Sequence, residues 1–193
     1  MAATLISAAM KADLATGNAR ILLIPQIDVL TDTSFTDADE IFTTDGTLAI
    51  AEAEPTKTSI KLDQNGGEIL TNTYQNGETT IKGTIPSQSS PLYDYIYNKI
   101  TANPVVSAAN LKIKGFSYQV AGVYSLNKKI IPVTMFVESA SRKTAIVFMH
   151  NDFYAIMDDK TVNTTVSSFG FTATNLHFEN GDFTVLKNGI ATT

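Results

Sequence analysis

Short alternating segments separated by asparagine–glycine pairs occupy residues 57–85, and they favour an antiparallel β fold. Polar and apolar side chains alternate along TSIKLDQ and along ETTIKGTI. Because successive side chains of a strand point to opposite faces, this alternation predicts a sheet with one buried face. Asn65-Gly66 and Asn76-Gly77 occupy the breaks, and both residue types tolerate the positive φ of tight hairpin turns. The segment is therefore predicted to form three antiparallel strands in a meander.

A short amphipathic helix is predicted directly after these strands, over residues 90–100. Ser90 supplies an N-cap and Pro91 a first-turn proline, which is typical of a helix start. The apolar residues at helical spacing form the expected buried stripe: Leu92, Ile96 and Ile100. Asn103-Pro104 is expected to end the helix, because the residue before a proline is disfavoured in the α region.

The composition supports a mainly β fold with a substantial core. The chain has 193 residues, of which 44% are hydrophobic. A globular chain of this size buries about 70% of the surface that its unfolded form exposes. Threonine, which favours half-buried pleated surfaces, is frequent. Further short strands recur at spacings of about 8–12 residues, as in sandwiches and barrels. The predicted fold is an antiparallel β-sandwich or barrel with one short flanking α-helix.

Three local features refine the strand pattern. Pro25 lies within the apolar segment 20–30 and cannot donate to a ladder, so this strand is expected at a sheet edge or a bulge. Residues 111–124 alternate continuously and are expected to form a single strand. The polar pair Asn151-Asp152 is expected to turn the chain between two short apolar strands.

The chain divides into an N-terminal arm or helix over residues 1–19 and a single β-rich domain over residues 20–193. Both interpretations of the N-terminal segment stay open, because alanine-rich ends form helices but also stay mobile without a firm partner. Residues 31–46 are polar, acidic and rich in turn formers. Loops of this length are often functional, so a long exposed loop with a contact role is predicted.

Neither a secretory signal nor a membrane span is expected. The first lysine stands at position 11, so no basic region precedes an apolar core. No apolar run approaches the roughly 18 residues of a spanning helix. The sequence therefore predicts an intracellular product without membrane insertion.

Charge and cysteine content exclude several classes of function. The formal net charge is −5, and no run of lysine and arginine exceeds a pair. A protein that grips nucleic-acid phosphates needs a basic patch, so tight DNA or RNA binding is not expected. The chain has no cysteine, which excludes disulfides, iron–sulfur clusters, thiolate zinc sites and cysteine nucleophiles.

No metal or cofactor site is predicted. A zinc site needs three or four converging ligands, and the chain offers only His150 and His177 besides its carboxylates. Structural or surface roles are expected for both histidines. One acidic run could present oxygen ligands to calcium: Asp32, Asp37, Asp39 and Glu40. Because it lacks the spacing and the distal glutamate of a calcium loop, it is interpreted as solvated.

Catalysis is not predicted either. Asp158 and Asp159 are neighbours in a strand and face opposite ways, which makes them a poor acid–base pair. The chain has no GxSxG, P-loop or GxGxxG motif. Tyr93 and Tyr97 share a helix face that Tyr95 does not, so core or subunit contacts are expected of them rather than ligand stacking.

The order of these segments resembles phage major tail tube proteins and the related Hcp-type injection tubes. An early apolar strand and a long acidic loop precede TSIKLDQ, two hairpins and a short helix. The segment TYQNGETTIKGTIPSQSSPLYDYI is similar to the tube-protein segment in which a polar strand closes on a small helix flanking the sheet. The resemblance spans residues 20–187 in pattern and depends mainly on residues 57–100.

The resemblance implies hexameric rings that stack into a hollow tube for DNA passage, within a virion tail. Strands within residues 57–85 would line the lumen, and the loop 31–46 would reach the next ring. The residues expected in that stacking contact are Asp32, Phe35, Asp37, Asp39, Glu40 and Phe42. The chain itself would be the main partner, with sheath or baseplate proteins as further ones. An acidic chain suits a lumen through which DNA passes as cargo, because like charge repels phosphate.

A β-sandwich binding module without catalysis, of the carbohydrate-binding or adhesin kind, is the alternative hypothesis. The absence of tryptophan disfavours sugar stacking, and the expected absence of a signal peptide disfavours export. A hydrolase on a β-barrel is a third hypothesis, for which no turnover is expected.

Overall fold

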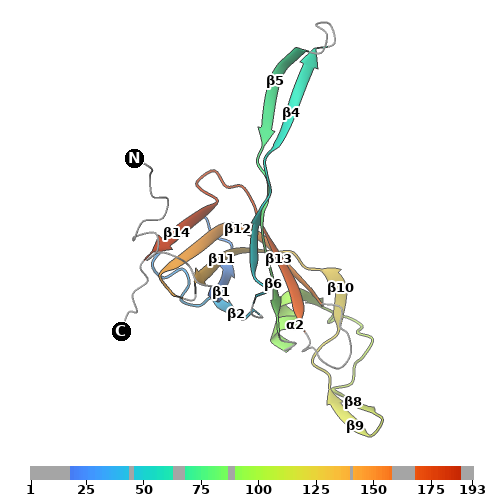
Figure 1. Cartoon of the computed structure of the whole chain (residues 1–193). Coiled ribbons are helices and arrows are strands. Elements are labelled where there is room, and N and C mark those ends of the chain that lie inside the picture. The colour runs from blue at the N-terminus through green and yellow to red at the C-terminus, as the bar shows by residue number, and fades with distance from the viewer. Residues whose placement is uncertain are drawn as a thin grey trace.

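The protein is described here by a computed structural model, shown in Figure 1. The residues that the structure describes are 18–43, 46–62, 68–86, 90–139, 141–157 and 168–187. Three predictions fall outside these ranges: most of the N-terminal arm or helix, the Asn65-Gly66 turn and the Asp158–Asp159 pair. Within the described ranges the fold is mainly antiparallel β with one short helix, which confirms the predicted class at that level.

The elements follow one another closely along the chain. The first strands are β1 (Asn18–Pro25), β2 (Asp39–Ile41), β3 (Ala49–Glu52), β4 (Thr56–Leu62), β5 (Glu68–Gln75) and β6 (Thr79–Ile85). Helix α2 (Ser90–Ile96) is followed by β7 (Tyr97–Lys99), β8 (Asn110–Ile113), β9 (Phe116–Gln119) and β10 (Tyr124–Lys128). The last strands are β11 (Ile131–Ser139), β12 (Thr144–Met157), β13 (Phe169–Asn175) and β14 (Phe183–Lys187).

Eight of the described strands form one sheet, and the other six form three two-stranded pairs. The sheet runs in the order β2-β1-β11-β12-β13-β6-β3, and β14 also pairs with β12. The separate pairs are β4–β5, β7–β10 and β8–β9. All of these pairings are antiparallel.

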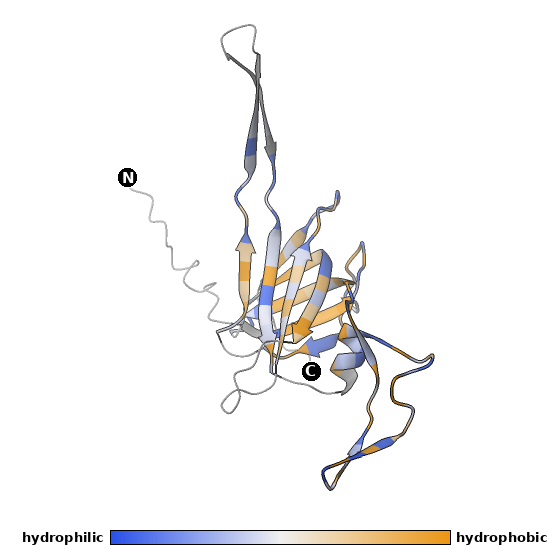
Figure 2. Ribbon diagram, turned by 90° about the vertical axis from the view of Figure 1, so that its right-hand side faces the viewer, coloured by the Kyte–Doolittle hydropathy of each residue, from blue (hydrophilic) through white to orange (hydrophobic). Residues whose placement is uncertain are grey.

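The hydrophobic core covers one face of the sheet. Ile21, Val137 and Ile146 lie in register across β1, β11 and β12 on this face, and Phe153, Phe169 and Phe171 continue it toward β13. Apolar side chains are concentrated in these strands (Figure 2). Full burial of one such side chain contributes about 1.5–3 kcal/mol.

Helix α2 closes the core at one end. Ile96 is 1% exposed, and the Tyr93 ring meets Phe169 edge-on at 5.2 Å between centroids. Tyr97 is also buried, so Tyr93 and Tyr97 take the core role expected of them. The helix is shorter than predicted. It ends at Ile96 because Tyr97–Lys99 pair with β10 as a strand, and Ile100 is left 39% exposed.

Strand β12 is continuous, and the predicted turn at Asn151-Asp152 is wrong. Its first part pairs with β14 and its second part with β13, while β11 runs along the opposite edge. A bulge in the β11–β12 register separates the two parts. Asn151 is fully buried at this point. Asn151, a residue type that sequence patterns associate with turns, therefore lies within a strand, at its bulge.

Buried polar side chains satisfy the backbone carbonyls that the bulge frees. The Asn151 amide donates to the carbonyl oxygens of Phe148 (2.9 Å) and Val133 (3.2 Å). The Thr134 hydroxyl donates to the carbonyl of Met149 at 2.5 Å. The half-buried Asn175 amide adds a second donor, at 3.1 Å, to the carbonyl of His150, which already accepts from the Leu176 amide at 2.8 Å. These bonds matter because an unpaired buried carbonyl costs about 1–3 kcal/mol.

Two further predictions about strands are wrong. Strand β1 is not at an edge, because β2 and β11 flank it. Pro25 is tolerated because it ends the strand, beyond residues 21–23 that pair with β2. The predicted three-stranded meander over residues 57–85 is also wrong, because β6 pairs with β13 and β3 and not with β5. Asn76-Gly77 therefore does not form a hairpin turn.

Replacing Asn151 with alanine is expected to lower the free energy of unfolding by about 3 kcal/mol. Two buried carbonyls, on Val133 and Phe148, lose their donor, and each unpaired group costs about 1–3 kcal/mol. Urea denaturation of the full chain measures the change. Asn127→Ala, at an exposed position, is the matched control and should stay within about 0.5 kcal/mol. Equal losses in the two variants would show that the amide does not support the bulge.

Candidate interaction surfaces

A long two-stranded arm projects from the sheet and carries the residues on which the family resemblance depends (Figure 1). We call residues 53–62 and 68–78 the β4–β5 arm. At its base β3 pairs with β6, from Ala49 opposite Lys82 to Glu52 opposite Thr79. Beyond the base, β4 pairs with β5. The chain from β3 to β6 is thus one long hairpin instead of a meander.

The two strands of this arm come closest at a waist between its base and β4–β5. The Ala53 amide donates to the Glu78 carbonyl at 3.0 Å. A Cβ on Gly77 would lie 1.9 Å from the Ala53 carbonyl oxygen, so only glycine permits this approach. The Asn-Gly pair that predicted a turn is therefore required for a close strand contact.

Beyond the waist the β4–β5 arm packs on nothing that the structure describes. Neither strand pairs with the large sheet, and the described side chains on β4 are exposed apart from Ser59, which is half-buried. An isolated two-stranded ribbon is at best marginally stable in water. Both edges of the arm lie outside the large sheet, and strand edges are where another chain can pair.

A second arm leaves the body on the opposite side (Figure 1). We call residues 100–123 the β8–β9 arm. Backbone bonds join Ile100 to Val123 and Ala109 to Val120, each at 2.8 Å. The strands β8 and β9 then meet at a two-residue turn, at which Lys114 and Gly115 have φ of 46° and 86°. The prediction of a single strand over residues 111–124 is therefore wrong, because the chain folds back at this turn to form a hairpin.

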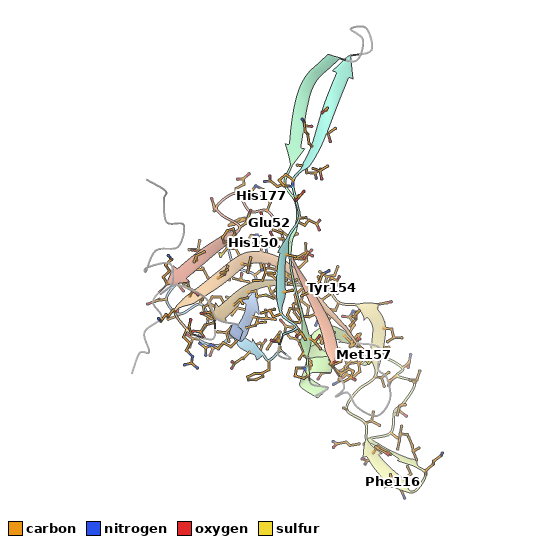
Figure 3. All side chains as sticks on the ribbon, viewed as in Figure 1. Glu52, Phe116, His150, Tyr154, Met157 and His177 are labelled. Carbon is orange, nitrogen blue, oxygen red and sulfur yellow. The ribbon has the colours of Figure 1, made fainter. Side chains whose placement is uncertain are left out.

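One face of the β8–β9 arm is apolar and exposed. Leu111 pairs with Tyr118 and Ile113 pairs with Phe116, so all four side chains lie on the same face. Their exposed fractions range from 37% at Leu111 to 67% at Phe116. Figure 3 places Phe116 on this arm, well away from the side chains of the body. The sequence prediction missed this face, although Lys114-Gly115 between two alternating runs is the signal of a hairpin.

A polar cluster fixes the base of the β8–β9 arm. The Tyr124 hydroxyl donates to Asp94 Oδ1 at 2.7 Å, and Lys99 Nζ lies 3.2 Å from the same oxygen. The hydrogen bond from Tyr124 and then the neighbouring Lys99 lower the pKa of the Asp94 carboxyl. Burial and the bond to Asp94 raise the pKa of Tyr124 to about 12. Helix α2 is thereby tied to both strands from which the arm begins.

The face of the sheet opposite the core is rich in hydroxyl groups. Across β12, β13 and β6, Tyr154 lies beside Thr172, which lies beside Lys82. Asp152, Thr174 and Thr80 form the next row. A shallow depression on this face is lined in part by Thr47, Lys82 and Tyr154.

The predicted stacking residues divide into two groups in the structure. Phe35 packs on its own chain, with its ring 5.4 Å from that of Phe136. Asp39 and Glu40 belong to strand β2, so residues 39–41 do not form part of a loop. The charged members are exposed on the surface, as is Phe42 at 65%. They are Asp32, Asp37, Asp39 and Glu40. Phe35 is thus half-buried against its own chain, whereas Phe42 is exposed.

Both histidines have carboxylate partners. His150 Nε2 lies 2.9 Å from Asp28 Oδ1, and its ring lies 4.0 Å from that of Phe178. His177 Nδ1 lies 3.1 Å from Asp182 Oδ1. Within the part of the chain that the structure describes, no group of three or more histidine and acidic residues is arranged to hold a metal ion.

The comparisons with known proteins assign no family. No protein-family model matches the chain, and no curated protein matches it. Among the helices of the described residues, none is long and apolar enough to cross a membrane.

Replacing Tyr124 with phenylalanine is expected to raise the pKa of Asp94 toward its ordinary value, because the largest cause of its lowering is lost. In the native protein the lowered pKa stabilises the fold above the unfolded pKa of about 4. That stabilisation is lost as the pH falls through the folded pKa. Carbon-detected NMR titration of the carboxyl measures the shift. Tyr118→Phe is the control, and an unchanged Asp94 pKa in Tyr124→Phe would contradict the assignment.

Replacing Gly77 with alanine is expected to open the waist of the β4–β5 arm without unfolding the body. The new Cβ would overlap the Ala53 carbonyl and push the strands apart. Hydrogen exchange measures the effect as faster exchange of the Ala53 amide, with β12 amides unchanged. Asn76→Ala, at the exposed neighbouring position, should leave both sets unchanged. Unaltered protection at Ala53 would contradict the close contact.

Proposed function

We propose that this chain is a structural subunit of a phage-type tail tube, which self-assembles into rings that stack around a hollow lumen. The observation that carries the proposal is the pair of arms that the body leaves uncovered. Each arm is a two-stranded ribbon, and neither belongs to the large sheet. Ribbons of this kind need a further layer to be stable, and a neighbouring subunit can supply it.

The β4–β5 arm supports ring stacking better than the loop 31–46 does. It reaches far beyond the body (Figure 1) and keeps both of its edges free of the large sheet. Exposed strand edges pair readily with another chain. In the segment 31–46, by contrast, Phe35 packs on its own chain and Asp39 pairs with β1 within the sheet. We therefore assign the contact with the next ring to the β4–β5 arm.

The hydroxyl-rich face of β6, β13 and β12 is the proposed lumen wall. Its side chains include several threonines, Tyr154 and Ile156, with Lys82 and Asp152 as charges of opposite sign. A wall with little net positive charge holds DNA weakly, because tight binding requires many phosphate contacts by lysine and arginine. DNA then passes as cargo. Rings of six subunits, a place in the virion tail, and sheath or baseplate partners are the corresponding expectations from the resemblance.

The non-catalytic binding module stays the second candidate. The shallow depression at Thr47, Lys82 and Tyr154 favours it. Two aromatic residues, Tyr154 and Phe171, line that depression, but Phe171 is buried in the core, and sugar recognition commonly uses exposed stacked rings. This depression is weaker support for a binding module than the two arms are for self-assembly. A glycan array with clear hits would favour the module.

The proposal is tested by light scattering behind a sizing column at several concentrations, with negative-stain imaging of the largest species. Rings with a central hole, or stacked tubes, are expected. A monomer at every concentration, without rings or tubes, would contradict the proposal and favour the binding module.

Shortening the β4–β5 arm tests its role in stacking. Residues 56–75 are deleted, and Pro55 is joined to Asn76 through an added Asn-Gly turn, which suits a tight hairpin. Because the deleted strands pair only with each other in the described structure, the body should keep its melting temperature. Rings without stacked tubes are expected by imaging. Tubes as long as those of the intact chain would show that stacking uses another surface.

A further inference from the structure

Charge is strongly segregated along this chain. Between Asp94 and Glu138 there are five lysines and no acidic residue. Between Arg20 and Lys57 there are eight acidic residues and no lysine, arginine or histidine. A net charge of −5 conceals this division. The basic stretch contains the whole β8–β9 arm, and the acidic stretch contains β2 and β3.

The basic stretch also carries the exposed apolar face of the β8–β9 arm. Ile113 is 52% exposed, Tyr118 54% and Phe116 67%. The arm extends away from the body in both views (Figures 1 and 2), so its own chain does not cover this face. Apolar faces on isolated ribbons mark interaction sites.

We propose that the β8–β9 arm docks on the acidic stretch 28–42 of a second copy of this chain. The acceptor surface presents exposed apolar side chains at Val29 (73%) and Phe42 (65%). The same stretch carries the exposed carboxylates of Asp32, Asp37, Asp39 and Glu40. The inference deepens the self-assembly proposed above, on which it rests, by naming one of its contacts.

A second copy fits this surface better than an unrelated partner does. The donor is basic and apolar and the acceptor is acidic and apolar, and one chain carries both. Two different patches that meet between identical chains make a head-to-tail contact, which closes into a ring or continues as a filament. The 24 residues from Ile100 to Val123 match the roughly 20–30 residues that each partner contributes to a stable interface.

The apolar side chains and the lysines have different roles in this contact. Leu111, Ile113, Phe116 and Tyr118 form its dry centre. Lys112 pairs with Ser117 on the opposite face and Lys114 stands at the turn, so both lysines belong to the rim. Rim charges steer association and select the partner more than they set affinity. Association should therefore weaken as salt is added, because the Debye screening length falls to about 3 Å at 1 M salt.

Reciprocal charge reversal tests the contact in the full-length chain. One variant combines Lys112→Glu with Lys114→Glu, and the other combines Asp32→Lys with Asp37→Lys. Sedimentation velocity measures self-association of each variant alone and of an equimolar mixture. Arg142→Glu with Lys143→Glu makes the same change in net charge as the first variant at exposed positions outside the arm. Circular dichroism confirms that every variant is folded.

Each reversed variant alone is expected to associate about tenfold more weakly or worse, because the arm and the acceptor stretch then carry charge of the same sign. The mixture should regain the association of the wild type, since each reversed surface finds its complement on the other chain. The Arg142/Lys143 control should associate like the wild type.

An apolar variant gives an independent measurement. Ile113→Ser with Phe116→Ser should weaken association about hundredfold without a change in melting temperature, because buried apolar centres supply most of the affinity. Leu126→Ser, at a position that is 82% exposed outside the arm, is the matched control.

The outcomes separate this inference from the proposed function. If charge-reversed and apolar variants associate as tightly as the wild type, the inference is wrong, while rings in negative stain would still support the tube subunit. If the mixture restores association but no rings or tubes form, the docking contact stands and the tube proposal fails. If the wild type stays monomeric at low salt and high concentration, both fail.

Discussion

The buried hydrogen bonds at the bulge of β12 are the interaction on which the rest of the structure depends. β12 is the longest strand, and it is the point at which β14 gives way to β13 along one edge of the sheet. A strand that changes partners must leave some backbone groups unpaired. The side chains of Asn151 and Thr134 donate to three carbonyls at this point, those of Val133, Phe148 and Met149. With these bonds made, one strand can hold both halves of the sheet and its core face stays continuous.

The continuous core lets the body support two arms that contribute nothing to it. Both arms begin at elements fixed by the core. β6, which carries one side of the β4–β5 arm, contributes the buried Ile81 and Ile85. The β8–β9 arm starts from α2 and β7, where Ile96 and Tyr97 are buried. A rigid attachment allows a ribbon that is marginal on its own to point in a defined direction. We interpret the arms as the parts of the molecule that a neighbouring subunit completes.

The two arms differ in chemistry and therefore in proposed partner surfaces. The β4–β5 arm offers free backbone edges, whereas the β8–β9 arm offers an apolar face with lysines at its rim. Edge pairing tolerates many sequences, because its bonds are made by the main chain. An apolar face flanked by one sign of charge is more selective. Stacking through the first arm and lateral docking through the second would give assembly two independent contacts.

Local patterns in the sequence determined the mainly β character of the chain, and the tertiary structure decided how the strands are paired and that Tyr97–Lys99 and Asn151-Asp152 lie in strands. Alternation correctly predicted the mainly β class, whereas the carboxylates beside His150 and His177, those of Asp28 and Asp182, became known only from the structure. The sequence pattern could not predict which strands pair, because the same Asn76-Gly77 dipeptide suits both a hairpin turn and a close contact between two strands. The same limit applies to Asn151, whose burial at a bulge depends on β11 and β13. The apolar face of the β8–β9 arm is seen only in the structure, in which the turn at Lys114-Gly115 places two alternating runs side by side. Period-two alternation fixes the face of a strand on which a side chain lies, but it does not fix which strand lies opposite.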